Sequence, residues 1–352
     1  MYEAFYGLRE RPFDLTPDPR FLVMTDAHAE VLSTLQYAIA SRKGVTLLIG
    51  EAGLGKTTLL RAALDRQPER VHFIYLQNPV LSRAEFLELL ARRFGLSKDA
   101  QASKTALLFE LEELLQQARR LDETTLLVVD EGQSLPAELL EEIRLLANIE
   151  TNNDKLLSVI LAGQPELADR LNDPSLRQLK QRIALRCRLR LLSPDETTAY
   201  VAGRVAAAGG VGREVFTREA VAAIHERSGG VPRTVSVIAD NALLGGFAAG
   251  RKPVVASIVQ DVCRDLDLPE PGATGGREAD ASGLPSLNGH DGTDHDAERA
   301  AQFRLLQARV SLPREDAAPE PKAKTPRKTA PDRPALFSSV TKKRRFFFFG
   351  SS

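Results

Sequence analysis

Apolar runs and helical periods alternate along the first 266 residues of the chain. Five runs are rich in Val, Ile and Leu without alternating polar positions, and they occupy residues 45–49, 71–77, 125–129, 156–162 and 184–191. Such runs are typical of strands in a parallel sheet whose two faces are covered by helices. The pattern therefore predicts an α/β fold in which helices flank a parallel five-stranded sheet.

The segments between these runs carry recognisable helix ends. The stretch SRAEFLELLARRFG predicts a helix with Ser82 as its N-cap, Glu85 completing a capping box and Gly95 as the stop. Residues 103–121 and 135–150 repeat apolar positions with the same helical period, so they are predicted to be helices as well.

The pattern divides the chain into four parts. A first segment with one helix (1–43) leads into the α/β core (44–192), and a small all-helical lid domain follows (193–266), where strand-like runs cease. In the remaining residues, 267–352, a short helix is predicted over 297–310, where Phe303, Leu306 and Val310 share a face. The other residues there are rich in Gly, Pro and Asp and show no apolar period. They are predicted to form a disordered linker and a basic, aromatic tail that ends in KKRRFFFFGSS.

Charge adds to this picture mainly in the last part. The formal charge of the whole chain is +0. Residues 267–300 contain eight acidic and two basic residues, whereas residues 301–352 contain four acidic and twelve basic residues. These balances of −6 and +8 leave −2 for residues 1–266, so the predicted folded part has no positive excess that would indicate a nucleic-acid binder.

Cysteine, histidine and hydropathy argue against several classes of protein. Cys187 and Cys263 lie far apart, and the five His lack metal-ligand spacing, which disfavours a disulfide framework or a zinc cluster and fits a reducing cytosol. No apolar run approaches the roughly 20 residues of a spanning helix, and the N-terminus carries charges throughout, unlike a signal peptide. The sequence thus predicts a cytoplasmic protein, at most peripheral at the inner membrane.

A glycine-rich loop carries the strongest chemical signal. Within VTLLIGEAGLGKTTLL, Gly50–Thr57 matches G-x-x-x-x-G-K-[ST] between a predicted strand and a predicted helix. Glycines let main-chain N–H groups surround phosphates, and the start of the following helix favours negative charge. Lys56 is predicted to reach the β- and γ-phosphates of ATP, and Thr57 to offer its hydroxyl to Mg²⁺. The predicted nucleotide ligands here are Gly50, Glu51, Ala52, Gly53, Leu54, Gly55, Lys56, Thr57 and Thr58.

Two adjacent acids supply a second part of the predicted site. The stretch LLVVDEGQSL places Asp130 at the end of a strand, where its carboxylate can hold Mg²⁺. Glu131 follows and is predicted to activate the attacking water as a general base. A loop with a lysine but without this glutamate would indicate binding without efficient turnover, so Glu131 favours an ATPase.

Two polar residues are further candidates for contact with the γ-phosphate. Gln164 in AGQPEL lies at the tip of a predicted strand, where it can sense the γ-phosphate or orient water, or serve as a polar turn residue before Pro165. Arg233 lies one residue into a helix that starts at Pro232. It is predicted to close on ATP from the lid, with a surface salt bridge as the alternative.

An arginine-rich stretch, LRQLKQRIALRCRLRL, supplies the last candidate. Arg182 precedes a predicted strand, so it is predicted to act as an arginine finger in a neighbouring subunit's site. Arg177 is a rival for this role, and a solvated basic face is the alternative for both. The predicted catalytic set is therefore Glu131, Lys56, Arg182 and Gln164.

Together these motifs resemble the AAA+ ATPases. The opening MYEAFYGLRERPFDLTPDPRFL, together with HAEVLSTLQYAI, AGQPEL and LSPDETTAYVAGRVAAAGG, more narrowly resembles the ExeA/GspA-type secretion ATPases over roughly residues 1–266. The resemblance implies ATP hydrolysis by a ring-forming or transiently oligomeric motor that uses the residues named above. It also suggests the adenine side as one use of Tyr2, Phe5, Pro12 and Phe13, with core packing as the favoured use.

The resemblance further implies partners at the cell envelope. ExeA-type proteins of type II secretion continue into a transmembrane helix and a periplasmic peptidoglycan-binding module, which these 352 residues lack. The stand-alone relatives associated with exopolysaccharide or exosortase systems therefore match better. The implied partners are further copies of the chain and an envelope or secretion machinery protein. The tail, Lys342–Phe349, is predicted to contact an anionic membrane surface or to dock on a partner protein.

Two other functions remain open on the sequence alone. A DNA-associated AAA+ ATPase of the transposition-helper or origin type is favoured by the arginine-rich stretch and the basic tail, and disfavoured by the charge of residues 1–266. A scaffold that binds ATP with little turnover is disfavoured by Glu131 and Arg182. Stimulation of hydrolysis by duplex DNA would distinguish the first, and a single-turnover assay the second.

Overall fold

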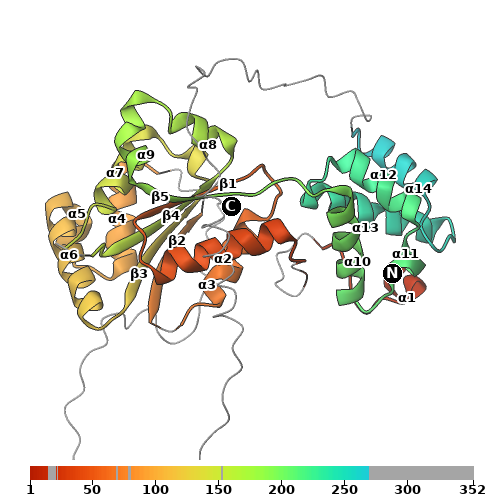
Figure 1. Ribbon diagram of the computed structural model, residues 1–352, viewed down its shortest axis with the longest axis horizontal. Helices are drawn as coiled ribbons and strands as arrows, with labels where there is room; N and C mark the ends of the chain where they lie inside the picture. Colours follow the sequence, from red (N-terminus) through yellow and green to blue (C-terminus); the bar gives the residue numbers. More distant parts are fainter. Residues whose placement is uncertain (15–20, 22, 69, 78–80, 152–153, 269–352) are drawn as a thin grey trace, which may run out of the picture. The chain divides into compact units, whose positions relative to one another are not determined.

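The computed structural model describes residues 1–14, 21, 23–68, 70–77, 81–151 and 154–268, shown as coloured ribbon in Figure 1. Five strands form one sheet in the order β2-β3-β4-β1-β5, and all four pairings are parallel. The strands are β1 (Val45–Ile49), β2 (Val71–Gln77), β3 (Thr124–Asp130), β4 (Leu157–Gly163) and β5 (Ile183–Arg188). The predicted parallel five-stranded α/β fold is confirmed.

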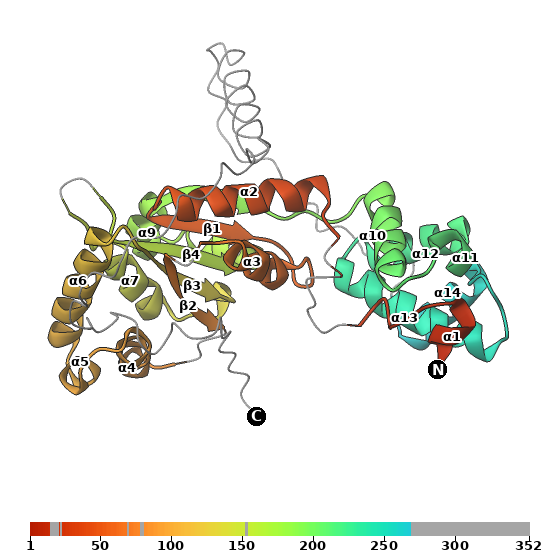
Figure 2. The ribbon, with the colours of Figure 1, turned by 90° about the horizontal axis from the view of Figure 1, so that it is seen from below.

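Helices cover both faces of this sheet, and Figure 2 shows α2 and α7 on opposite sides of it. Neighbouring residues of β1 point to opposite faces, so Leu47 and Leu48 enter different hydrophobic clusters. One cluster packs against α2 (Asp26–Ala40) and α3 (Lys56–Asp65). The other packs against α4 (Arg83–Phe94), α6 (Lys104–Arg120) and α7 (Ala137–Leu146).

The central strands β1, β3 and β4 are buried along their whole length, as the unbroken apolar runs predict. The two outer strands are not. β5 alternates exposed and more buried residues, and it ends at Arg188 instead of continuing to residue 191. As an edge strand it has a neighbour on one side only, so fewer of its side chains are covered.

Two predicted helices can be compared with the structure in detail. Ser82 and Glu85 form the predicted capping box of α4, and Gly95 ends the helix in the left-handed conformation. The helix predicted over 135–150 is shorter at both ends, because α7 begins only after Pro136 and ends at Leu146. Leu135 is extended, the conformation that a following proline favours, so the helix does not include it.

Only helices follow β5 within the described residues. They are α10 (Pro194–Ala207), α11 (Gly212–Val215), α12 (Arg218–Ser228), α13 (Pro232–Ala248) and α14 (Ala256–Asp265). Their hydrophobic core also contains the first residues of the chain: α1 (Tyr2–Tyr6) contributes Tyr2 and Tyr6, and Phe13 is buried beside Phe216. The N-terminal segment thus packs partly with these helices, whereas α2 packs on the sheet.

Two negative findings apply to the described ranges alone. None of the helices there combines the length and apolar character needed to cross a bilayer. No group of three or more His, Cys, Asp or Glu residues there is arranged to hold a metal ion. Apart from Asp267 and Leu268, the predicted linker and tail, including the helix predicted over 297–310 and Lys342–Phe349, lie outside the described residues.

Candidate nucleotide-binding site

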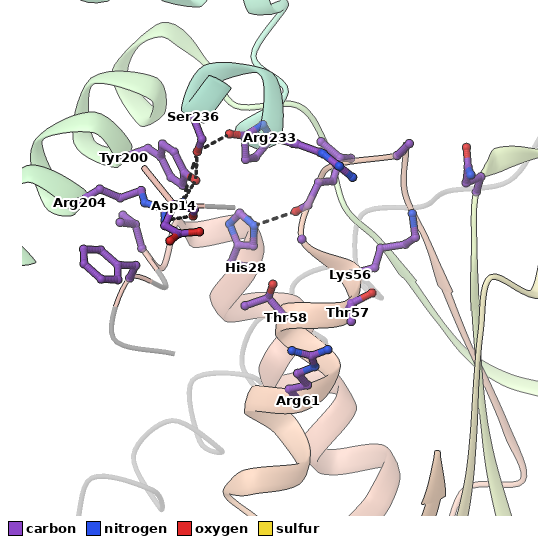
Figure 3. Close-up of a pocket in the computed structure, with 18 of the residues that line it drawn as sticks. Asp14, His28, Lys56, Thr57, Thr58, Arg61, Tyr200, Arg204, Arg233 and Ser236 are labelled. Carbon is purple, nitrogen blue, oxygen red and sulfur yellow. Dashed lines mark hydrogen bonds between the residues drawn. The ribbon is translucent and has the colours of Figure 1, made fainter. Parts of the chain in front are cut away.

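The parallel sheet brings three loops to one edge. In the pairing of β1 with β4, Ile49 lies opposite Gly163, and in that of β2 with β3, Gln77 lies opposite Asp130. The loops that follow β1, β3 and β4 therefore leave the sheet side by side. A cavity of about 530 Å³ lies there, lined by residues from these loops, the N-terminal segment, α10 and α13 (Figure 3).

The loop after β1 has the conformation that phosphate binding requires. Gly53 and Gly55 have φ values of 82° and 90°, in the left-handed region that residues with a Cβ rarely adopt. α3 begins directly afterwards at Lys56, so the first main-chain N–H groups of this helix are free of intrahelical partners. A helix start of this kind attracts an anion, because its N–H groups and the helix dipole both present positive charge.

Lys56 is held inside this loop. Its Nζ donates to the carbonyl oxygens of Gly50 at 2.7 Å and Glu51 at 3.0 Å, and only 5% of the residue is exposed. Burial lowers the pKa of the Lys56 ammonium, and the nearby carboxylates of Glu131 and Asp130 oppose that shift. The ammonium thus lies beside the cavity, within reach of an anion bound by the loop.

Thr57 and Asp130 are 73 residues apart in the sequence, and their side chains are hydrogen-bonded in the structure. The Thr57 hydroxyl donates to Asp130 Oδ2 at 2.7 Å, and the Tyr75 hydroxyl donates to the same oxygen at 2.7 Å. The other carboxylate oxygen, Oδ1, accepts from the main-chain N–H of Glu131 at 3.0 Å. A hydroxyl and a carboxylate side by side form the hard oxygen donor set that Mg²⁺ prefers, so these residues fit the predicted ion.

Tyr75 was not predicted to belong to the site. Burial, and then the charge of Asp130, raise the pKa of its phenol well above the usual value, so the hydroxyl stays protonated and donates. In the sequence, Tyr75 is one of several apolar and aromatic residues of a strand run, VHFIYLQ. Its partnership with Asp130 follows only from the pairing of β2 with β3.

Glu131 lies in the cavity wall, where β3 has ended. Its φ of 56° is in the left-handed region, which costs a non-glycine residue conformational energy and is often found at functional sites. Its carboxylate accepts a hydrogen bond from Gln133 Nε2 at 2.5 Å. The structure therefore brings this predicted base to the same cavity as Lys56 and Thr57.

Gln164 and Arg233 also line the cavity. Gln164 precedes α8 (Pro165–Arg170) and follows the end of β4. Arg233 lies in the first turn of α13, and its main-chain N–H donates to Gly53 O at 3.2 Å. A Cβ at Gly53 would lie 2.9 Å from Arg233 Cβ, so α13 can approach the loop only because Gly53 has no side chain.

Arg177 and Arg182 are not in this cavity. Both lie in α9 (Arg177–Arg182), which precedes the first residue of β5. Ile183 pairs with Val45, the first residue of β1. The glycine-rich loop Gly50–Thr57, called the phosphate-type loop from here on, follows Ile49, the last residue of β1. The two arginines are thus at the opposite end of the sheet, and a role for either in ATP chemistry requires the site of another copy of the chain.

His28 lies against the phosphate-type loop, which the sequence did not predict. Its Nδ1 is 2.7 Å from the Thr25 hydroxyl, and its Nε2 is 3.4 Å from the carbonyl oxygen of Leu54. Burial lowers the pKa of this imidazole, which favours the neutral form. Thr25 is recognisable as the N-cap of α2, but no sequence signal relates His28 to a loop 26 residues away.

Arg204 joins the N-terminal segment to the cavity wall. Its guanidinium donates to the carbonyl oxygens of Pro12 at 2.6 Å and Asp14 at 3.0 Å. It also lies 5.4 Å from the ring centre of Phe21 and 5.5 Å from that of Tyr200, distances typical of cation–π contacts. Figure 3 shows Arg204 and Asp14 on the side of the cavity away from Lys56.

The aromatic residues suggested for the adenine side serve the helical core instead. Tyr2 and Phe13 are buried there, Phe5 packs against it, and Pro12 contributes a carbonyl oxygen to Arg204. The cavity is lined by other residues of the N-terminal segment, namely Asp14, Phe21 and Val23. Core packing, the use favoured from the sequence, therefore describes their positions.

The family comparison covers both parts of the predicted site. A family model described as an AAA domain matches residues 39–171, which include the glycine-rich loop and Asp130–Glu131. General secretion pathway protein A of Aeromonas hydrophila is 40% identical over 255 residues. That alignment takes in 72% of this chain and 46% of the relative, so the chain spans about half the length of this curated protein.

Solved structures with a similar fold have much lower identity. The ORC2 protein of Aeropyrum pernix has a TM-score of 0.55 at 19% identity, covering 73% of this chain and 71% of that one. CDC6P of Pyrobaculum aerophilum has a TM-score of 0.53 at 17% identity, covering 72% and 70%. These similarities concern the fold alone. The family rests on the sequence comparisons: the AAA domain match and the 40% identity to general secretion pathway protein A show that the chain belongs to the AAA+ ATPases of the ExeA/GspA type.

Proposed function

We propose that this chain hydrolyses ATP in a Mg²⁺-dependent reaction. A homo-oligomer would use the free energy released to drive assembly or export of cell-envelope material from the cytoplasmic side. One observation carries the catalytic part of the proposal: Lys56, Thr57 and Glu131 line one cavity, and Thr57 contacts Asp130. The 40% identity to general secretion pathway protein A supports the link to secretion.

Binding and chemistry are divided between the loop after β1 and the end of β3. The N–H groups at the start of α3 and the Lys56 ammonium bind the phosphates and stabilise negative charge that develops on them. Thr57 and Asp130 would hold Mg²⁺, which, when bound, neutralises charge on the β- and γ-phosphate oxygens. Glu131 accepts a proton from the water that attacks the γ-phosphorus. The bond between the γ-phosphorus and the oxygen that bridges it to the β-phosphate breaks, and ADP leaves with that oxygen.

Gln164 and Arg233 extend this assignment to the edges of the cavity. Gln164 reaches the cavity from the end of β4. Arg233 enters from α13, in main-chain contact with Gly53. We assign Gln164 to orientation of water or γ-phosphate, and Arg233 to closure of the helical part on the bound nucleotide.

Tyr75→Phe tests the proposed metal site. The variant keeps the ring but removes the hydroxyl that donates to Asp130, so the carboxylate is less firmly oriented. The Mg²⁺ concentration for half-maximal phosphate release is expected to rise about tenfold, the lower end of effects seen when such supporting hydrogen bonds are lost. Tyr37→Phe is the matched control, because Tyr37 is 41% exposed on α2 and does not line the cavity. An unchanged Mg²⁺ requirement in Tyr75→Phe would contradict the assignment of Asp130.

Arg182 is tested by mixing two inactive variants. Arg182→Ala is expected to lower the rate of hydrolysis about 1,000-fold or more, as removal of an arginine finger does. Its own site stays complete, whereas a Glu131→Gln subunit has an intact Arg182. Mixing the two should restore phosphate release, because one subunit then supplies the arginine and the other supplies the base.

Arg177→Ala is the control in the same assay, since Arg177 lies on the same short helix. Full activity of Arg182→Ala together with loss in Arg177→Ala would assign the finger to Arg177. Failure of the mixed variants to recover would contradict an action between subunits.

The cellular setting is tested by effectors of hydrolysis. We expect phosphate release to respond to a membrane-bound partner of the envelope machinery and to be indifferent to duplex DNA. Stimulation by DNA that disappears with rising salt would instead favour the nucleic-acid alternative. Sedimentation of the full chain with and without residues 336–352, using anionic vesicles, tests the proposed contact with the inner membrane.

A further inference from the structure

Gln133 lies between the two strand ends that carry Glu131 and Gln164. It belongs to η2 (Gly132–Ser134), the short 3₁₀ turn after β3. Its side-chain Nε2 donates to Glu131 Oε2 at 2.5 Å, and its Oε1 accepts from the main-chain N–H of Gln164 at 3.0 Å. A single amide group thus joins the carboxylate after β3 to the main chain after β4.

The Glu131 carboxylate and the Gln164 N–H allow only one orientation of the Gln133 side-chain amide. The main-chain N–H of Gln164 can only donate, and an ionised Glu131 carboxylate can only accept. Exchanging the amide oxygen and nitrogen would place donor against donor and acceptor against acceptor. The hydrogen bond to Glu131 therefore has a direction that is set by the neighbouring strand end.

Gln133 is itself held by its surroundings. Arg170 Nη1, on α8, donates to the main-chain carbonyl oxygen of Gln133 at 2.5 Å. The turn also packs closely on β4, because a Cβ at Gly132 would lie 2.8 Å from Leu161 Cδ1, and one at Gly163 would lie 2.9 Å from Gln133 Oε1. Side chains at these two glycines would separate the turn from β4, so their absence keeps the two strand ends together.

The position of the Glu131 carboxylate is thus defined from both ends of the residue. The left-handed main chain, with a φ of 56°, sets the direction in which the side chain leaves. The hydrogen bond from Gln133 then fixes the carboxylate at the other end. A base that must point at one water molecule benefits from such restraint, since a displacement of about 1 Å can cost roughly 100-fold in rate.

We propose that Gln133 is a positioning residue for ATP hydrolysis, which holds the Glu131 carboxylate towards the attacking water and ties that direction to the main chain of Gln164. The inference rests on the proposed function, because Gln133 has this role only if Glu131 acts as the base. A residue that acts through the base lowers turnover and leaves nucleotide binding intact.

Gln133→Glu tests this role with nearly the same side-chain shape. The variant keeps an oxygen that can accept from the Gln164 N–H, but it replaces the donor facing Glu131 with a second acceptor. The kcat for ATP is expected to fall roughly 100-fold, as for a misplaced base. The KM for ATP and the Kd of a non-hydrolysable analogue are expected to stay within about twofold of the wild type. Gln133→Met removes both hydrogen bonds without adding charge and should also lower kcat selectively.

Gln116→Glu is the matched control. Gln116 donates from its Nε2 to Glu112 Oε1 at 3.2 Å on the exposed face of α6, so this change also places a carboxylate beside a glutamate. It lies away from the cavity, and its kcat is expected to equal that of the wild type.

Two results would overturn the proposal. The first is a wild-type kcat in both Gln133 variants. The second is a loss of kcat accompanied by an equal loss of nucleotide binding and by a lower Tm, which would assign Gln133 a structural role. Failure of the proposed function would be distinct from both, since hydrolysis would then be absent from the wild type or retained in Glu131→Gln.

Discussion

Glu131→Gln is expected to lower the rate of phosphate release by roughly 100- to 10,000-fold, the contribution of a positioned general base. The amide that replaces the carboxylate has a similar shape but cannot accept a proton from water. Nucleotide binding should be retained, because the phosphate contacts come from the loop after β1 and from Lys56. The measurements are steady-state phosphate release and the Kd of a fluorescent ATP analogue.

The control for Glu131 is Glu138→Gln. Glu138 is an exposed acid in the first turn of α7, outside the cavity, and it belongs to the segment that follows the same strand. This variant should hydrolyse ATP at the wild-type rate. Hydrolysis at that rate by Glu131→Gln would refute the assignment of the base, and the chemistry would have to be sought elsewhere in the cavity.

Lys56→Ala is expected to weaken ATP binding by roughly 100-fold or more. The estimate follows from hydrogen bonds to charged groups, which contribute about 1.5–3 kcal/mol each, and from the lysine's reach to two phosphates. Hydrolysis should be lost with binding, in contrast to Glu131→Gln, where binding remains. Calorimetry with ATP and Mg²⁺ measures this effect directly.

Lys43→Ala is the matched control for this loss of a cation. Lys43 precedes β1, at the end of the sheet opposite the phosphate-type loop, and its ammonium lies 5.6 Å from the ring centre of Tyr37. Its removal should leave the Kd for ATP unchanged. The Tm of Lys56→Ala without nucleotide must also be compared with that of the wild type, because Lys56 donates to two carbonyl oxygens of its own loop. Wild-type affinity in Lys56→Ala would contradict the proposed binding site.

Local pattern in the sequence predicted much of the fold. The five strand runs correspond to β1–β5: β1 and β2 have the predicted bounds, β3 and β4 differ by one residue at each end, and β5 begins one residue and ends three residues earlier than predicted. The capping box at Ser82 and Glu85 is formed as predicted, since it depends on residues three positions apart. The predicted start of α7 at residue 135 was wrong. The apolar positions keep the helical period there, but Pro136 favours an extended conformation for the residue before it, so the helix begins at Ala137.

Local sequence also indicated the residues that the structure gathers at the cavity from the loop after β1 and the end of β3. The glycine-rich loop and the Asp130–Glu131 pair are each contiguous, so their residue types and spacing are visible without a fold. Their proximity is not local. It arises because parallel strands end at one edge of the sheet and β4 lies between β1 and β3.

Only the tertiary structure decided how distant residues support this chemistry. Tyr75 reaches Asp130 because β2 lies beside β3, and Gln133 reaches Gln164 because the ends of β3 and β4 are adjacent. The sequence by itself determined the strands, the helix caps and the phosphate-type loop, since these depend on periods and contacts within a few residues. Strand order and the hydrogen bonds across it depend on packing between segments far apart in the chain, and no local period encodes that packing.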